Sequence, residues 1–358
     1  MLRKVLLSPY YLTLSLRHLF FDKGWKKSFK ASVPTVCVGN ITVGGTGKTP
    51  HTEMILRTLL ASDRWAYSNI AVLSRGYKRK SKGFQVVPRG GDADLYGDEP
   101  SQIARKFPLV TVAVDADRIN GCSKLAPPSE IVVLDDAFQY RKLRARVNVI
   151  LVDYNRPVKK DVLLPLGSLR DLPSRLKAAD ILIVTKCPAF LDQSERTSWA
   201  AGLGIKDYNP TTCTGHNKKG KEQYVFFTGI KYGEMTPVFP EDADNRFTYA
   251  KRLILFSGIA KDGPLVRYLG DKFSVVKHLR FPDHHRYTKS DMGRIRTAVR
   301  TEPTAIVCTT EKDAGRVTSC KSVPAELRSR LFCLPIEATF LTPEEQEIFT
   351  AALLRAVE

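Results

Sequence analysis

The chain has 358 residues, more than one typical hydrophobic core holds, so we expect two domains. Its 56 Lys and Arg residues exceed its 37 Asp and Glu residues, giving a formal net charge of +19. This excess favours polyanionic partners, whether nucleic acid, an anionic membrane surface or a phosphorylated substrate. The seven cysteines include no Cys-x-x-Cys pair, so we expect free thiols in a reducing cytosol, no zinc site and no disulfide framework.

The first 30 residues form a region of their own. An apolar and aromatic run at 5–16 has Arg and Lys on both sides. It is too short and too interrupted to cross a bilayer, which takes about 20 apolar residues, and no small-residue cleavage site follows it. We expect residues 1–30 to form a helix region at the membrane interface. The alternative is an amphipathic helix docked on the core of the domain.

The next segment predicts a nucleotide-binding loop. An apolar run at 34–40 precedes Thr42-Val-Gly-Gly-Thr-Gly-Lys-Thr49, and an amphipathic stretch at 54–60 follows it. A strand, a glycine-rich turn and a helix start in this order bind nucleotide phosphates through backbone N–H groups. In such a loop Lys48 reaches the β- and γ-phosphates and the Thr49 hydroxyl ligates Mg²⁺. The expected nucleotide-binding residues are Thr42, Val43, Gly44, Gly45, Thr46, Gly47, Lys48 and Thr49, with Thr42 standing where the usual pattern has Gly.

The rest of the chain predicts an α/β fold. Apolar strand-like runs separated by helical stretches indicate a mostly parallel, P-loop NTPase-like sheet that is buried on both faces. These runs lie at 35–38, 70–73, 109–114, 131–134, 147–152 and 181–184. We expect the P-loop domain to cover 31–210. Polar, turn-like segments around one extended run predict a two-stranded connector over 211–251, and renewed strand–helix alternation predicts a smaller α/β domain over 252–358.

Acidic residues stand where phosphoryl transfer needs them. The apolar run 131–134 ends in Asp135 and Asp136, and a carboxylate at a strand end beside a phosphate loop commonly binds Mg²⁺. Asp98 and Glu99 precede a helical stretch, a position that the helix dipole also favours for acids. The turn Phe281-Pro-Asp-His-His285 carries side chains that can act as a general base, and is otherwise a surface turn.

Two basic clusters, at 75–82 and 141–146, either bind phosphate or anionic lipid or form solvated faces. They lack a convincing interleaving of aromatic residues, and no helix-turn-helix pattern accompanies them, so we expect no nucleic-acid partner. Val184-Thr-Lys-Cys-Pro188 follows a strand, as the guanine-reading motif of GTPases does. Because Pro188 replaces the Asp of that motif, the segment argues against guanine specificity.

Taken together, the motifs resemble the tetraacyldisaccharide 4′-kinase family, the lipid A kinases of Gram-negative bacteria. The matching segments follow the family's order through both expected domains, and Thr42 is a family feature. They are Val38-Gly-Asn-Ile-Thr-Val-Gly-Gly-Thr-Gly-Lys-Thr-Pro50, Ser74-Arg-Gly-Tyr77, Gly97-Asp-Glu-Pro100, Leu134-Asp-Asp-Ala-Phe-Gln139, Leu163-Leu-Pro-Leu-Gly-Ser-Leu-Arg-Asp171, Phe256-Ser-Gly-Ile259, Pro282-Asp-His-His285 and Thr310-Glu-Lys-Asp-Ala314.

The resemblance implies a function and a location. It implies transfer of the γ-phosphate of ATP, with Mg²⁺, to the 4′-hydroxyl of a tetraacyldisaccharide 1-phosphate. The enzyme is expected to be a monomer bound peripherally or monotopically at the cytoplasmic face of the inner membrane. The anionic acylated disaccharide and the membrane surface are its expected partners.

The resemblance also implies roles for single residues. Asp98 is expected to be the general base, with His284 as its partner after closure of the small domain, and Lys48 is the third catalytic residue. The expected metal-binding residues are Thr49, Asp135 and Asp136. The expected substrate-binding residues are Asn40, Arg75, Glu99, Arg170 and Asp171.

Four positions depart from the family pattern. Ala137 and Tyr140 stand where the family usually has Gly and His, and Leu166 and Asp171 replace the commoner Ala and Glu. Ala137 is compatible with an ordinary backbone conformation but not with a positive φ. Tyr140 replaces a titratable imidazole with a phenol, so the resemblance does not carry over to Tyr140 the proton or nucleotide contact of that His.

Two other functions remain open. One is a membrane-associated P-loop ATPase with a regulatory or partitioning role, although Val43 occupies the place of the first Lys in that class. The other, a nucleic-acid-dependent ATPase, rests on net charge alone.

Overall fold

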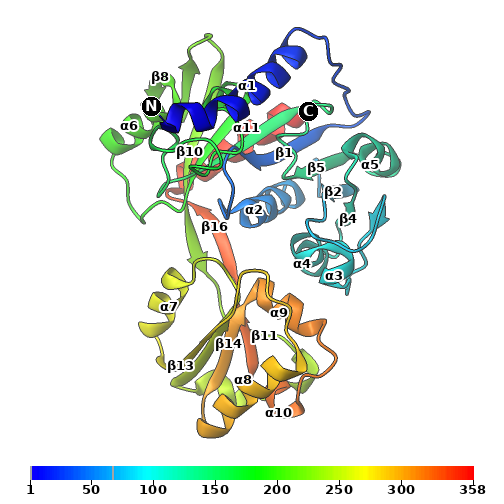
Figure 1. Ribbon diagram of the computed structural model, residues 1–358, viewed down its shortest axis with the longest axis vertical. Coiled ribbons are helices and arrows are strands. Elements are labelled where there is room, and N and C mark those ends of the chain that lie inside the picture. Colours follow the sequence, from blue (N-terminus) through cyan, green and yellow to red (C-terminus); the bar gives the residue numbers. More distant parts are fainter. Residues whose placement is uncertain (1, 67) are drawn as a thin grey trace.

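The computed structural model describes residues 2–66 and 68–358, and within them eleven strands form one mostly parallel sheet (Figure 1). Every neighbouring pair from β4 to β10 is parallel. In spatial order the strands are β3 (Gln85–Val86), β4 (Thr111–Val114), β2 (Ile70–Ser74), β5 (Ile131–Asp135), β1 (Thr35–Asn40), β6 (Val147–Asp153), β7 (Ile181–Thr185), β10 (Glu222–Tyr232), β9 (Thr214–Asn217) and β8 (Ile205–Asn209), with β16 (Ile336–Phe340) paired to β10. The predicted α/β sheet is confirmed.

Both faces of this sheet are covered, which explains the continuous apolar runs. Along β1, Val36 and Val38 point into one hydrophobic core and Cys37 points into the other. The first core is covered by α2 (Lys48–Leu60), α4 (Asp98–Lys106) and α11 (Pro343–Val357). The second is covered by α1 (Leu2–Asp22), α5 (Arg118–Leu125) and α6 (Gln193–Leu203). The short helical elements are α3 (Ala93–Tyr96) and four 3₁₀ segments, Val158–Lys160, Pro173–Ala178, Pro240–Asp242 and Asn245–Tyr249.

Helix α1 has a docked side and an exposed side. Leu14 packs into the core of the large sheet, as the docked-helix alternative predicts, and His18 is buried beside it. Tyr11, Leu12 and Leu16 are exposed on the same helix. None of the helices built from the described residues combines the length and apolarity needed to cross a bilayer.

A second sheet forms the smaller domain. Its spatial order is β11 (Thr236–Pro237), β15 (Leu331–Leu334), β14 (Ile306–Thr310), β12 (Arg252–Ser257) and β13 (Ser274–Arg280). Helix α7 (Gly263–Gly270) packs on one face through Leu265 and Leu269. The other face is covered by α8 (Lys289–Thr301), α9 (Glu311–Thr318) and α10 (Ala325–Arg328).

A ribbon of two antiparallel strands joins the domains (Figure 1). Residues 224–227 of β10 pair with β7, whereas residues 228–232 pair with β16. Just beyond the ribbon, Gly233 N donates to Pro335 O at 2.9 Å. The small domain is therefore an insertion at 233–335, reached by strands that enter and leave side by side.

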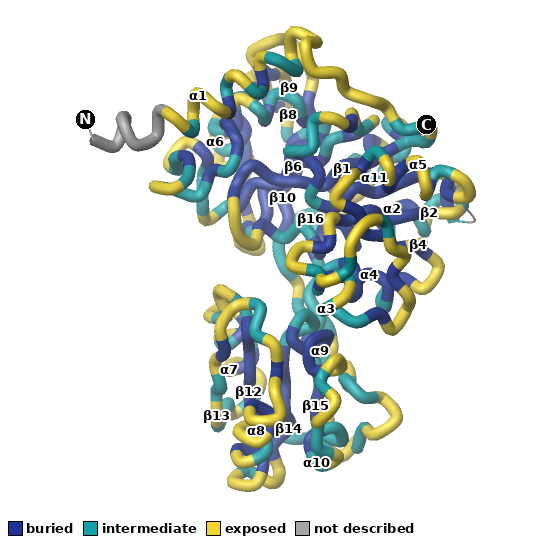
Figure 2. The backbone as a smooth tube through the Cα atoms, turned by 45° about the vertical axis from the view of Figure 1, so that its right-hand side comes forward, coloured by how far each residue is buried: buried dark blue, intermediate teal, exposed yellow. Residues whose placement is uncertain are grey.

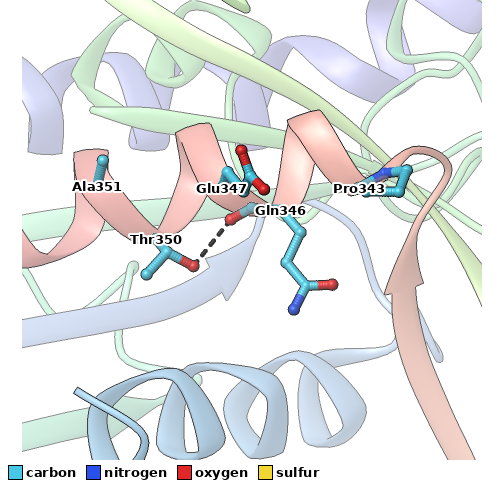
Figure 3. A pocket seen from close by; sticks show the side chains of 5 residues that line it. All are labelled: Pro343, Gln346, Glu347, Thr350 and Ala351. Atoms are coloured by element: carbon cyan, nitrogen blue, oxygen red, sulfur yellow. Dashed lines mark hydrogen bonds between the residues drawn. The ribbon is translucent and has the colours of Figure 1, made fainter.

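This topology corrects two of the predicted boundaries. Of the predicted connector 211–251, only residues 228–232 belong to the ribbon, because β9 pairs with the first part of β10 at the edge of the large sheet. Residues 343–357, predicted in the small domain, form α11, and Phe349 and Leu353 are buried in the core of the large domain. In Figure 2, α11 lies with the large sheet and apart from the small domain. The exposed side of α11 carries a surface hollow with no predicted site residue (Figure 3), lined by Pro343, Gln346, Glu347, Thr350 and Ala351.

Candidate active site

The phosphate loop runs from Asn40 at the end of β1 to Lys48 at the start of α2. Gly47 precedes α2 with φ +89°, a left-handed conformation that an L side chain rarely adopts. The first amide groups of α2 therefore face the loop, as in anion-binding helix starts. The buried Asn40 amide lies 2.6 Å from Thr46 Oγ1 and 3.4 Å from Thr42 Oγ1. Thr42 thus places its hydroxyl inside the loop, where it makes a contact that Gly would lack.

Side chains from the neighbouring strand ends also hold the loop. Thr185 Oγ1 donates to Thr46 O at 2.9 Å, and Lys186 Nζ donates to Gly45 O. Lys186 Nζ also lies 2.8 Å from Asp153 Oδ2, at the end of β6. The Thr-Lys pair that resembles a guanine-reading motif therefore supports the phosphate loop from the end of β7.

Asp135 ends β5 as a buried carboxyl group. Ser74 Oγ donates to its Oδ2 at 3.0 Å, whereas its buried Oδ1 has no hydrogen-bond partner among the described residues. Burial, and then the charges of Asp136 and Glu99, raise the pKa of Asp135 to about 6. A carboxylate with an unpaired buried oxygen in this setting is suited to bind a cation.

Asp136 lies between two cationic side chains. Lys48 Nζ is 3.6 Å from its Oδ2, and the Arg170 guanidinium contacts both of its oxygens. Arg170 Nη2 also donates to Asn40 Oδ1 at 2.5 Å. Asp136 has φ +50°, and Ala137 is not among the residues with a positive φ. The Ala137 departure therefore requires no backbone conformation that alanine resists.

Two glycines bring Asp98 beside the end of β2. A Cβ atom on Gly97, which has φ +99°, would lie 3.2 Å from Gly76 Cα. The two turns that follow β2 and precede α4 therefore pack backbone against backbone. Asp98 is the first residue of α4, and the charge of Glu99 reaches Asp135. This packing brings the predicted base and the predicted metal-binding carboxyl groups to one edge of the sheet.

The small domain contacts Asp98 with two side chains. His284 Nδ1 lies 3.0 Å from Asp98 Oδ2, and Arg316 Nη2 lies 2.7 Å from the same oxygen. Burial would raise the pKa of Asp98, but the hydrogen bonds from His284 and Arg316 outweigh it and hold the pKa well below its usual range. The Asp98–His284 pair that was predicted to form on closure is assembled in this arrangement.

Sequence reasoning missed Arg316. On α9, Lys312 and Arg316 are four residues apart and share a face, and Lys312 Nζ lies 2.8 Å from Glu99 Oε1. These two cationic side chains thus form ion pairs with the consecutive acids Glu99 and Asp98. The spacing is visible in the sequence, because Lys312 lies within the segment Thr310-Glu-Lys-Asp-Ala314 and Arg316 follows two residues after it.

Asp171 is placed differently from the other predicted substrate-binding residues. It is fully buried, and its Oδ1 lies 2.6 Å from His18 Nε2 of α1. Arg141 Nη1 lies 3.2 Å from His18 Nδ1. Because a guanidinium only donates, Nδ1 accepts and Nε2–H donates to Asp171. A side chain enclosed in this way does not contact substrate here, so Asp171 holds α1 beside Arg170 instead.

Arg75 and Tyr140 lie at the same end of the sheet. Arg75 follows β2 and is exposed. Tyr140 OH donates to Asp117 Oδ1 at 2.8 Å, and burial together with this contact raises the pKa of Tyr140 to about 12. Asp117 caps α5, so the phenol that replaces the family's usual imidazole stabilises a helix start.

Comparisons with known proteins agree with this geometry. Residues 2–358 match the family model described as tetraacyldisaccharide-1-P 4′-kinase. A tetraacyldisaccharide 4′-kinase of Parabacteroides distasonis is 38% identical, with 94% of this chain and 89% of that protein covered. One from Porphyromonas gingivalis is 36% identical, with 99% and 96% covered. The crystal structure of "apo" form LpxK from Aquifex aeolicus in complex with ATP matches with a TM-score of 0.72 and 26% identity over 100% of both chains. The chain belongs to the tetraacyldisaccharide 1-phosphate 4′-kinase family.

Proposed function

We propose that this protein transfers the γ-phosphate of ATP to the 4′-hydroxyl of a tetraacyldisaccharide 1-phosphate. The observation that carries the proposal is the meeting of Asp98 with His284 and Arg316 beside the phosphate-loop edge of the sheet. An ATPase that only hydrolyses ATP has no acceptor alcohol to bind. It therefore does not need a carboxylate that one domain supplies and the other domain orients. The relatives bear the name of this kinase, and the Aquifex aeolicus structure contains ATP.

The phosphate loop and the strand ends bind the donor. Backbone amides of residues 42–49 and the Lys48 ammonium cradle the phosphates. Thr49 and the unpaired Oδ1 of Asp135 fit Mg²⁺, with Asp136 beside them. When bound, Mg²⁺ supplies positive charge that neutralises the transferring phosphoryl group. Arg170 holds Asp136 and Asn40 together, so it fixes the two halves of this donor site relative to each other.

Asp98 orients and deprotonates the acceptor. Its carboxylate accepts the proton of the 4′-hydroxyl, while His284 and Arg316 keep it ionised and aimed. Phosphoryl transfer passes through a loose transition state in which the hydroxyl needs positioning more than a strong base. A carboxylate whose pKa is held low therefore serves this reaction, because its ionised form is present at every physiological pH.

The acylated substrate requires access to a lipid surface. Helix α1 supports such access because Tyr11, Leu12 and Leu16 are exposed on it, and Trp25 is exposed just beyond its end. With a net charge of +19, the protein is attracted to anionic lipid and to the substrate phosphate. We place the enzyme at the cytoplasmic face of the inner membrane, as a monomer, with α1 lying in the interface.

One assay tests the reaction. The protein is incubated with γ-labelled ATP, Mg²⁺ and tetraacyldisaccharide 1-phosphate in mixed micelles, and the label is followed into lipid and into free phosphate. Label in the lipid is expected. Label in free phosphate alone would favour the membrane-associated ATPase, and stimulation of that release by DNA or RNA would favour the nucleic-acid-dependent one.

A further inference from the structure

We infer that His51 is a positioning residue that ties the phosphate loop to the ribbon between the domains. The binding of ATP phosphates and the placement of the small domain are then energetically linked. The inference rests on the proposed use of the loop for ATP. It concerns a histidine that contacts neither Asp98 nor the metal-binding carboxyl groups.

The imidazole of His51 is fully buried in the first turn of α2, three residues after Lys48. Its Nδ1 lies 2.7 Å from Gly47 O. A carbonyl oxygen only accepts, so Nδ1 carries the proton. A Cβ atom on Gly47 would lie 3.3 Å from this nitrogen, so the ring packs directly against the glycine that begins the helix. Any shift of the ring therefore displaces the peptide that positions Lys48.

The other ring nitrogen of His51 contacts the ribbon. Its Nε2 lies 2.9 Å from Thr228 Oγ1. With the proton on Nδ1, Nε2 accepts, and the Thr228 hydroxyl is the donor. Thr228 is fully buried and is the residue at which β10 changes partner from β7 to β16. The hydrogen bonds thus run from Thr228 through His51 to the Gly47 carbonyl.

Thr228 lies where a movement of the small domain would displace its hydroxyl. It pairs with Phe340 of β16, and Cys187 N donates to its carbonyl oxygen at 2.9 Å. The ribbon that begins here carries the domain that supplies His284 and Arg316 to Asp98. Rotation of the ribbon moves the Thr228 hydroxyl and, through His51, the phosphate loop. A loop ordered by ATP reciprocally favours the ribbon geometry that brings the domains together.

Conservative variants test this link in the full-length protein. Thr228→Val removes the hydroxyl and keeps the shape, Thr228→Ser restores it, and His51→Asn removes the ring. The matched control is Thr52→Val, because Thr52 is the next residue of α2, is fully buried, and has no hydrogen-bond partner for its hydroxyl among the described residues. ATP affinity is measured by calorimetry without lipid, so the result stands even if lipid phosphorylation is not observed. Urea unfolding shows that each variant is folded.

Loss of one buried hydrogen bond predicts an ATP affinity about fivefold weaker in Thr228→Val. Thr228→Ser and Thr52→Val should stay within about twofold of the parent, and His51→Asn/Thr228→Val should be no weaker than His51→Asn alone. Hydrogen exchange at 336–340 should slow on ATP addition in the parent and not in Thr228→Val. Equal ATP affinity of Thr228→Val and Thr52→Val would overturn the link, and so would ATP-dependent protection of 336–340 that survives in Thr228→Val.

Discussion

Arg316 Nη2 lies 2.7 Å from Asp98 Oδ2, so a cation of the small domain is paired with the first residue of α4 in the large domain. His284 contacts the same oxygen. The carboxylate is therefore positioned by a neighbouring domain, and it is fully oriented only while the two domains are together. The same contacts lower the pKa of this carboxyl group, which we propose as the general base.

Removing Arg316 should shift the pH dependence of turnover. Burial raises the pKa of Asp98, and the contacts from His284 and Arg316 lower it. In Arg316→Met part of that lowering is lost, so the acidic limb of the kcat profile should move to higher pH. The measurement is kcat at saturating ATP and lipid from pH 3 to 9, because a carboxyl group whose pKa is held below its usual range titrates at the acidic end of the profile. Arg300→Met, at an exposed position on α8, should leave the profile unchanged. Superimposable profiles for Arg316→Met and the parent would mean that Arg316 does not act on the base.

Asp98 itself should control turnover and not nucleotide affinity. We expect Asp98→Ala to lower kcat by about 10²–10⁴-fold, the range for a lost general base, with ATP affinity nearly unchanged. His284→Ala should lower kcat less and alter the pH profile. Near-native turnover of Asp98→Ala at saturating substrates would remove Asp98 from the mechanism. An unaltered pH profile in His284→Ala would remove only its partner.

Asp135 should lower the stability of the metal-free protein at neutral pH. Its folded-state pKa of about 6 exceeds the ordinary 3.8, so the folded state holds a proton that the unfolded state releases between these values. Stability therefore falls as the pH rises through that window, by on the order of 2–3 kcal/mol. In EDTA, Asp135→Asn should melt at a higher temperature than the parent at pH 8 and at a similar temperature near pH 4.

A second buried carboxyl group is the control for this effect. Burial raises the pKa of Asp153, but Lys186 outweighs it and lowers the pKa overall. Asp153→Asn should therefore lose stability at pH 8, the opposite sign to Asp135→Asn. Addition of Mg²⁺ should raise the melting temperature of the parent and not that of Asp135→Asn. Destabilisation by both substitutions at pH 8 would contradict the assignment of Asp135 as an unpaired anion.

Lipid association should depend on the exposed side of α1 and not on its presence alone. Because Leu14 and His18 belong to the buried side, deleting residues 1–22 would remove part of the core with the helix. The double substitution Leu12→Glu/Leu16→Glu changes exposed positions only. It should weaken binding to anionic liposomes in sedimentation while ATP binding persists. Leu109→Glu, at a leucine 80% exposed on a different part of the domain, is the matched control. If Leu12→Glu/Leu16→Glu and Leu109→Glu both sediment with liposomes like the parent, α1 serves only to pack on the core.

Removing His18 while Asp171 stays in place should lower the free energy of unfolding. His18→Leu removes this hydrogen-bond donor and leaves the buried Asp171 carboxylate beside an apolar side chain, which costs about 1–3 kcal/mol. Asp171→Asn removes the charge and still accepts the hydrogen bond from Leu172 N. We therefore expect urea unfolding to show a large loss for His18→Leu and substantial recovery in His18→Leu/Asp171→Asn. Additive losses in the double variant would show that the two side chains do not act as a pair.

The features predicted correctly from the sequence are those with local signatures. The strand, glycine turn and helix around Lys48, and the strand ending in Asp135, are each defined by fewer than about twenty neighbouring residues. The missed residues have distant partners. Arg316 is 218 positions from Asp98, His51 is 177 from Thr228, and His18 is 153 from Asp171. No local pattern specifies which of many basic or polar side chains meets which acid.

The domain boundary was wrong for a related reason. The apolar positions of 343–357 fit a helix on any sheet, and their sequence neighbours belong to the small domain. Only the pairing of β16 with β10 directs this helix back to the large core. A continuous strand that changes partner at Thr228 looks, in sequence, like any other buried strand.

The insertion of the small domain has a consequence for synthesis of the chain. The ribosome completes residues 233–335 before it makes α11, yet Phe349 and Leu353 of α11 fill the core that begins at β1. The large sheet therefore keeps one apolar face open until α11 is available to cover it. That face includes Phe226, whose ring centroid lies 5.4 Å from that of Phe349 in the finished protein. Chains that lack α11 should therefore expose this apolar face and bind chaperones more strongly than the finished protein.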